Sequence, residues 1–134
     1  MNKCLLDTDI LSALMKKDQT ALKHAQKYLK KYNTLTMSII TQYEILRGLK
    51  VKNATKQILI FENICTKNEI LQVTDTIIIK ATDIYSVLYK KGKLIGDADI
   101  LIAATALVHN LELITNNENH FNRISGLRID NWIK

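Results

Sequence analysis

Residues 3–11 read KCLLDTDIL, a short apolar run that stops at an aspartate and leads into a second apolar stretch. Residues 4–6 are continuously apolar, which is typical of a strand buried on both faces of a parallel sheet. Thr8 or Asp9 can then begin a helix, because a short polar side chain caps the free amide groups of a helix start. The segment therefore predicts the opening of a parallel α/β fold.

The alternation of strand and helix patterns continues along the rest of the chain. Further apolar runs that suit strands lie near residues 35–39, 70–73, 111–115 and 127–129. Helical spacing of apolar residues predicts helices over residues 21–32, from Ser38 or Thr41 to near Gly48, over 54–64 and 77–88, and from Asp97 to about His109. No linker-like segment interrupts the pattern. We therefore predict one domain, residues 1–134, built as an α/β/α sandwich whose central parallel sheet has four to five strands flanked by helices.

Composition narrows the class of protein and the kind of partner. The chain has 134 residues, of which 47% are hydrophobic and 24% charged, as in globular domains. Its 19 basic and 13 acidic side chains give a net charge of +6, which favours polyanionic partners such as nucleic acid. No signal peptide or membrane-length apolar stretch is visible, and the two cysteines are far apart in sequence. We therefore expect a cytoplasmic protein without a membrane partner.

Carboxylates occupy the places where an α/β sheet usually binds its ligands, outside the carboxyl ends of the strands. Asp7 follows the first strand, Asp97 and Asp99 open an apolar helix, and Glu44 lies on a helix that can project to the same edge. Each acid alone is explained equally well as a helix cap or a surface ion pair. Together they would repel one another, and a hard cation such as Mg²⁺ or Mn²⁺ would relieve that repulsion.

Five stretches of the chain carry a resemblance to a known family. They read LLDTDIL (5–11), EILRG (44–48), IGDADILIAA (95–104), TNN (115–117) with Phe121, and GLRIDNW (126–132). In this order and spacing they resemble a PIN domain and, more narrowly, the VapC-type toxin ribonucleases of bacterial and archaeal toxin–antitoxin pairs. The resemblance implies a PIN-like sandwich and a metal-dependent endoribonuclease.

The resemblance also implies roles for individual acids. Asp7, Glu44 and Asp99 match the acidic core, which would be catalytic and would bind the metal. Asp97 would be an accessory metal ligand. The expected cofactor is Mg²⁺ or Mn²⁺, which would activate water for in-line attack on the phosphodiester and leave 5′-phosphate and 3′-hydroxyl ends.

Polar residues elsewhere in the motifs would support these acids. Thr115 and Asn116 would orient a carboxylate or a water molecule. Asn117 would assist them, although many PIN domains have a further aspartate there, and its absence weakens the case for a second tightly held metal. Arg47, one turn from Glu44, would contact substrate phosphates.

The resemblance further implies an RNA substrate, with tRNA or another structured RNA as candidates, a cognate antitoxin protein and a toxin homodimer that joins the antitoxin in a heteromeric complex. The chemistry needs no histidine. His24, His109 and His120 are therefore set aside, and only His120, through its position near Asn117, has a route to the substrate.

Two other function classes remain as alternatives. A catalytically silent PIN-like module that binds RNA or protein would have the same fold, but it would have no need to hold three acids together. A receiver-type phosphoacceptor domain also gathers acids at a sheet edge. It would require an acceptor aspartate after a middle strand and a later lysine, and neither is evident.

Overall fold

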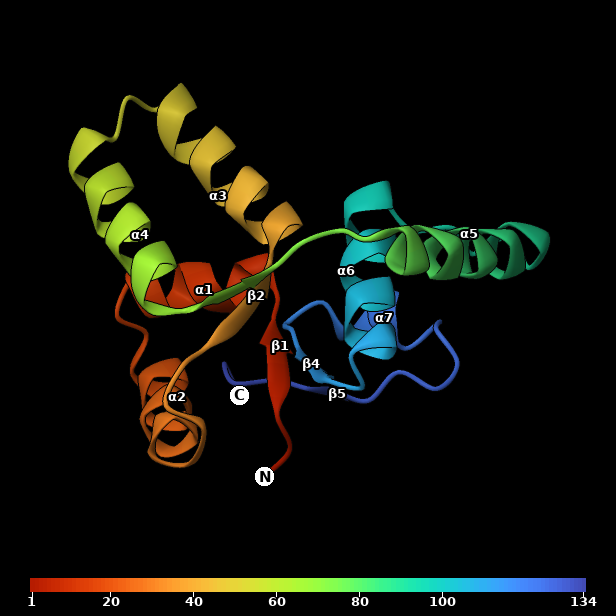
Figure 1. The fold of residues 1–134 in the computed structure, drawn as a ribbon, viewed down its shortest axis with the longest axis horizontal. Helices are drawn as coiled ribbons and strands as arrows, with labels where there is room; N and C mark the ends of the chain where they lie inside the picture. Colours follow the sequence, from red (N-terminus) through yellow and green to blue (C-terminus); the bar gives the residue numbers. More distant parts are fainter.

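A parallel sheet of five short strands lies at the centre of the structure, a computed structural model that describes residues 1–134 (Figure 1). The strands are β1 (Cys4–Leu6), β2 (Thr36–Ser38), β3 (Glu69–Leu71), β4 (Glu112–Ile114) and β5 (Ile129–Asp130). Their order across the sheet is β3-β2-β1-β4-β5, and every pair is parallel. The predicted parallel sheet is thus confirmed, with its amino-terminal strand in the middle.

Helices cover both faces of this sheet. They are α1 (Thr8–Met15), α2 (Gln19–Tyr32), α3 (Ile39–Val51), α4 (Thr55–Lys67), α5 (Asp75–Lys90), α6 (Asp97–Val108) and α7 (Glu118–Phe121). Successive side chains of β1 point to opposite faces. Leu5 packs in a core with α5, α6 and α7, whereas Cys4 and Leu6 pack in a second core with α1 to α4. The two cores give the predicted α/β/α sandwich.

Two helices show how the sequence pattern produces these layers. On α2, Ala21, Ala25 and Tyr28 are buried, and the Tyr28 hydroxyl accepts a 3.1 Å hydrogen bond from the backbone N–H of Cys4. On α6, residues 102–106 are all buried, because this helix lies between the sheet and α5. No helix in the structure is at once long enough and apolar enough to span a bilayer.

The structure corrects two local predictions. The helix expected to stop near Gly48 continues to Val51, and the left-handed turn after it falls at Asn53, with a φ of 53°. A glycine inside a helix costs only about 1 kcal/mol, so it did not end this one. The first helix is capped by Asp7, whose side chain accepts from the N–H of Thr8, rather than by Thr8 or Asp9.

The sheet register determines which residues meet at its carboxyl edge. Leu6 of β1 pairs with Ile114 of β4 and with Met37 of β2. Asp7 and Thr115, which directly follow β1 and β4, therefore lie at the level of Ser38, the last residue of β2. The starts of α1 and α3 lie at this edge too, since each follows its strand directly.

Candidate active site

Asp7 is the most deeply buried acid at the carboxyl edge, with an exposed fraction of 5%. Its backbone N–H continues the ladder to the carbonyl of Ile114 at 2.9 Å. One side-chain oxygen, Oδ1, accepts from the N–H of Thr8 at 2.7 Å, and Oδ2 accepts from the hydroxyl of Thr115 at 2.8 Å. The carboxyl group is therefore held in one orientation by the residue that follows β4 and by the first residue of α1.

Asp9 lies beside Asp7, in the first turn of α1. Its Oδ2 accepts a 3.0 Å hydrogen bond from the N–H of Asn116, and its Oδ1 is buried without any hydrogen-bond partner. The sequence pattern predicts Asp9 only as a helix cap, and the structure adds this residue to the site. The signal that was available is its spacing, because an acid two residues after a strand end remains at the same sheet edge.

Burial and mutual repulsion make these acids reluctant to ionise. The pKa of Asp7 is raised to about 7, first by burial and then by the neighbouring charges of Asp9 and, more weakly, Asp99, while the hydrogen bonds from Thr115 and Thr8 lower it. Burial also raises the pKa of Asp9, with a smaller contribution from Asp99. The three aspartates thus share one electrostatic neighbourhood.

Glu44 reaches this neighbourhood from α3 through a threonine. The hydroxyl of Thr8 donates to Oε1 of Glu44 at 2.6 Å, while the N–H of the same residue donates to Asp7. Thr41, also on α3, lies 3.2 Å from the Thr8 hydroxyl. Thr8 therefore couples the position of Glu44 to that of Asp7.

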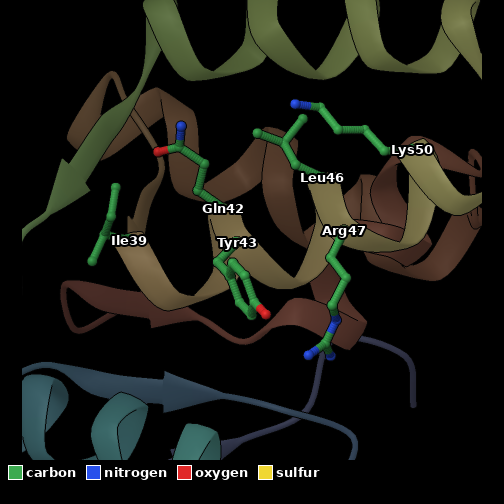
Figure 2. Close-up of a pocket in the computed structure, with 6 residues that line it drawn as sticks. All are labelled: Ile39, Gln42, Tyr43, Leu46, Arg47 and Lys50. Atoms are coloured by element: carbon green, nitrogen blue, oxygen red, sulfur yellow. The ribbon is translucent and has the colours of Figure 1, made fainter.

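Arg47 follows one turn after Glu44, and its guanidinium lies 3.9 Å from Oε2 of that acid. The guanidinium also stands over the ring of Tyr43, 5.1 Å from its centroid, and both side chains leave the same side of α3 (Figure 2). More than half of the Arg47 side chain is exposed, at 56%. The arrangement leaves this cation available to a phosphate next to the acids.

A cavity of about 570 Å³ opens beside Thr8 and Glu44, between α1, α3 and α4. Lys16 and Lys52 are among its lining residues. Lys16 also lines a second hollow that Asp9 borders. Basic side chains thus flank the acids on more than one side, as binding of a polyanion requires.

The structure separates the two acids of the DAD sequence. Asp99, in the first turn of α6, makes a 2.9 Å contact from Oδ2 to Nδ1 of His120. Asp97 is exposed and lines a hollow between α5 and α6 together with Tyr85 and Ile78. The carboxyl group of Asp97 makes no hydrogen bond or ion pair, so its accessory role stays a prediction.

The polar residues after β4 lie where they can orient the acids. Thr115 holds Asp7, the N–H of Asn116 holds Asp9, and the N–H of Asn117 donates to the Thr115 hydroxyl at 3.0 Å. The side-chain amide of Asn117 lies 2.8 Å from Nδ1 of His120. Two of the three orienting contacts use backbone N–H groups, which a sequence pattern does not reveal.

His120 lies closer to the acids than the sequence predicts. It belongs to the four-residue helix α7, which was not predicted, and it contacts both Asp99 and Asn117. The other two histidines lie elsewhere. His24 stacks against Trp132 with ring centroids 6.0 Å apart, and His109 caps the end of α6.

The oxygen atoms of these acids are suitable ligands for a hard divalent cation. In the structure, however, no three Asp, Glu, His or Cys side chains lie close enough together to hold a metal ion. The buried, unpartnered Oδ1 of Asp9 lacks a positive partner. The raised pKa values of Asp7 and Asp9 show that their negative charge is poorly compensated. Carboxylate oxygens are the ligands that Mg²⁺ and Mn²⁺ prefer.

Comparison with known proteins identifies the relatives of this arrangement. The family model of the PIN domain matches residues 4–127. The ribonuclease VapC1 of Methanocaldococcus jannaschii is 35% identical over 130 residues, which cover 96% of this chain and 87% of that protein. Among solved structures, VapBC2 from Rickettsia felis bound to a promoter DNA fragment matches with a TM-score of 0.81 at 28% identity, covering 96% of this chain and 97% of the matched one. DNA-bound VapBC from Salmonella typhimurium matches with a TM-score of 0.86 at 27% identity, covering 98% and 99%.

Proposed function

The chain belongs to the PIN domain family, and we propose that it is an endoribonuclease toxin of a toxin–antitoxin pair that hydrolyses RNA with the help of Mg²⁺ or Mn²⁺. The observation that carries this proposal is the group of aspartates at the sheet edge, Asp7, Asp9 and Asp99. Burial and the charges of Asp9 and Asp99 raise the pKa of Asp7, and burial and the charge of Asp99 raise the pKa of Asp9. The ribonuclease name of its relative and the VapBC structures it resembles support the same reading.

Asp7, Glu44 and Asp99 are the residues that we assign to the metal and to catalysis. Asp9 joins them, because its free Oδ1 is buried beside Asp7. Asp97, which lines a hollow on the α5 side, would act only at longer range as an accessory acid. A bound divalent cation lowers the pKa of water and neutralises charge on the phosphate oxygens.

Residues of the chain prepare the acids before substrate arrives. Thr115 and the N–H of Thr8 fix the two oxygens of Asp7, and the N–H of Asn116 fixes Oδ2 of Asp9 while Oδ1 stays free. The hydroxyl of Thr8 fixes Glu44. Carboxylates held in this way need little rearrangement during reaction, which lowers the barrier.

The substrate is an RNA strand whose phosphates meet Arg47 and the lysines around the cavity. Arg47 stands next to Glu44 and is largely exposed, so it can approach a phosphate oxygen without leaving the site. Such contacts position a nucleic acid without reading its sequence. A loop of tRNA or of another structured RNA fits best, because its unpaired strand can enter a surface cavity. Attack of water on phosphorus breaks the P–O3′ bond and leaves 5′-phosphate and 3′-hydroxyl ends.

We further propose that residues 1–134 act as one domain in the cytoplasm, as a homodimer that joins a cognate antitoxin. The matched VapBC structures support the antitoxin partner. The exposed apolar side chains of α5 support a protein interface on that helix. These side chains are Ile78, Ile79, Tyr85, Val87 and Tyr89.

Cleavage of total cellular RNA by the purified, antitoxin-free protein tests the proposal. We expect discrete fragments with 5′-phosphate ends in Mg²⁺ or Mn²⁺, and no fragments in EDTA or with Asp99→Asn. Asp83→Asn is the matched control, because Asp83 is exposed on α5 away from the acids, and it should cleave as wild type does. Cleavage that survives EDTA would overturn the metal mechanism. Folded protein that never cleaves would favour the silent binding module.

A further inference from the structure

The contact between His120 and Asp99 joins two helices, α7 and α6, whose contacting residues are 21 positions apart in the sequence. Nδ1 of His120, on α7, lies 2.9 Å from Oδ2 of Asp99, on the first turn of α6. The side chain of His120 is 39% exposed and that of Asp99 is 23% exposed, so the pair lies at the rim of the acidic site. No other side chain makes a hydrogen bond with Asp99, so His120 is the residue that determines its orientation.

The chemistry of the two groups assigns the hydrogen between them. An ionised carboxylate can only accept, so Nδ1 of His120 must carry the proton that bridges to Oδ2 of Asp99. The amide nitrogen Nδ2 of Asn117 is placed 2.8 Å from the same ring nitrogen, so the nitrogen and oxygen of this amide exchange places when Nδ1 carries the proton. Its amide can meet a protonated Nδ1 only by presenting its oxygen, because two N–H groups cannot hydrogen-bond to each other. The bridging hydrogen leaves Oδ1 of Asp99 without a partner and free to bind a cation.

The short helix α7 is anchored firmly enough to hold His120 in place. Phe121, the next residue, is completely buried in the core that α5 and α6 share. Glu118, at the start of α7, accepts from the side-chain amide of Asn131 at 3.1 Å and pairs with Lys134 at 2.7 Å. His120 is therefore presented to Asp99 by a helix that is fixed at both ends.

We propose that His120 is the positioning residue of Asp99, donating from Nδ1 to Oδ2 so that Oδ1 stays free for a divalent cation. The inference rests on the proposed function, because it assumes that Asp99 binds a metal. Residues that hydrogen-bond to a metal ligand set its orientation, and losing one typically weakens metal affinity by about 10- to 100-fold. The role differs from that of a ligand or a substrate contact, both of which would use Nε2.

Three substitutions separate these roles. His120→Asn places an amide nitrogen where Nδ1 stands, since both atoms are two bonds beyond Cβ, and should keep most of the affinity. His120→Gln places an amide nitrogen near the position of Nε2 instead, and this variant should lose most of its Mg²⁺ affinity. His120→Ala should weaken Mg²⁺ binding by about 10- to 100-fold. His109→Ala is the matched control, because His109 is exposed at the end of α6.

The measurement is calorimetric titration of the folded, RNA-free proteins with Mg²⁺, with Trp132 fluorescence as the check on folding. Nitrogen NMR of the neutral imidazole supplies a second readout. His120 should be protonated on Nδ1 in the wild type and should revert to the Nε2–H tautomer, which free imidazole side chains favour, in Asp99→Asn.

The outcomes are distinct. Wild-type protein that binds no Mg²⁺ would count against the proposed function itself. Wild-type binding that His120→Ala leaves unchanged would overturn the positioning role alone. If His120→Gln keeps the Mg²⁺ affinity and His120→Asn loses it, the positioning role is overturned as well. His120 would then contact the metal or the RNA through Nε2.

Discussion

Replacing Asp7 by asparagine is expected to stabilise the metal-free protein at alkaline pH while abolishing its response to Mg²⁺. The carboxyl group is almost fully buried, and burial together with Asp9 raises its pKa from an ordinary value of 3.8 to about 7. An asparagine can accept from Thr8 through its oxygen and donate to the Thr115 hydroxyl through its nitrogen, as the protonated acid does. The substitution thus removes the buried charge and keeps the contacts.

The magnitude follows from the change in pKa. The folded protein binds the Asp7 proton more tightly than the unfolded chain, so this group favours folding below about pH 4, and that contribution is lost as pH rises to about 7. A rise in pKa from 3.8 to about 7 corresponds to about 4 kcal/mol, at about 1.4 kcal/mol for each pH unit. We therefore expect the free energy of unfolding of Asp7→Asn to exceed that of wild type by about 2 to 4 kcal/mol at about pH 8 in EDTA. At about pH 4 the two values should differ little.

Urea unfolding followed by tryptophan fluorescence provides the assay, since Trp132 is the sole tryptophan and is buried in the core of α1 to α4. Each protein is unfolded across the pH range in EDTA and again with Mg²⁺. Mg²⁺ should stabilise wild type at about pH 8 and leave Asp7→Asn unchanged, because a ligand stabilises only the state that binds it. Asp83→Asn should follow wild type throughout. A stability difference between wild type and Asp7→Asn that does not change with pH would refute the reasoning.

Three further changes test other parts of the site. Thr8→Val removes the 2.6 Å hydrogen bond to Glu44 and should lower kcat by about tenfold, measured by single-turnover RNA cleavage, with stability reduced by about 1 kcal/mol. Asp97→Asn should keep most of the cleavage rate under conditions in which Asp99→Asn loses it; equal losses would show that Asp97 binds the metal directly. Phe121→Ala should lower the free energy of unfolding, measured in urea, by about 3 to 5 kcal/mol, because the Phe121 ring is fully buried beneath α7. A decrease below about 1 kcal/mol would contradict the anchoring of that helix.

The layers of the fold were predictable because each depends on a local pattern. The apolar run at residues 4–6 indicated a strand with two buried faces, and the alternation of strands with amphipathic helices indicated a parallel sheet. The end of α3 was predicted wrongly, because Gly48 resembles a helix stop in isolation while neighbouring residues continue the helix to Val51. The four-residue helix α7 is too short to give a periodic signal.

The acids of the site were predictable in kind but not in their contacts. Asp7 and Asp99 were predictable because one follows a strand and the other begins a helix. In the structure the two are close enough for the charge of Asp99 to raise the pKa of Asp7. Asp9 was read as a cap, since a polar residue there satisfies the same local rule. His120 meets Asp99 only through tertiary packing of α7 against α6, which no spacing in the sequence encodes.

The central claim is that the carboxylates at this edge of the sheet hold the cation that the reaction uses. Its most direct test is the anomalous scattering of crystals grown with Mn²⁺, from protein that cleaves RNA in the same metal. We expect an anomalous peak in contact with the carboxylates of Asp7 and Asp99, and none in crystals of Asp99→Asn. A peak elsewhere on the protein, or none at this edge in crystals of the active enzyme, would contradict it.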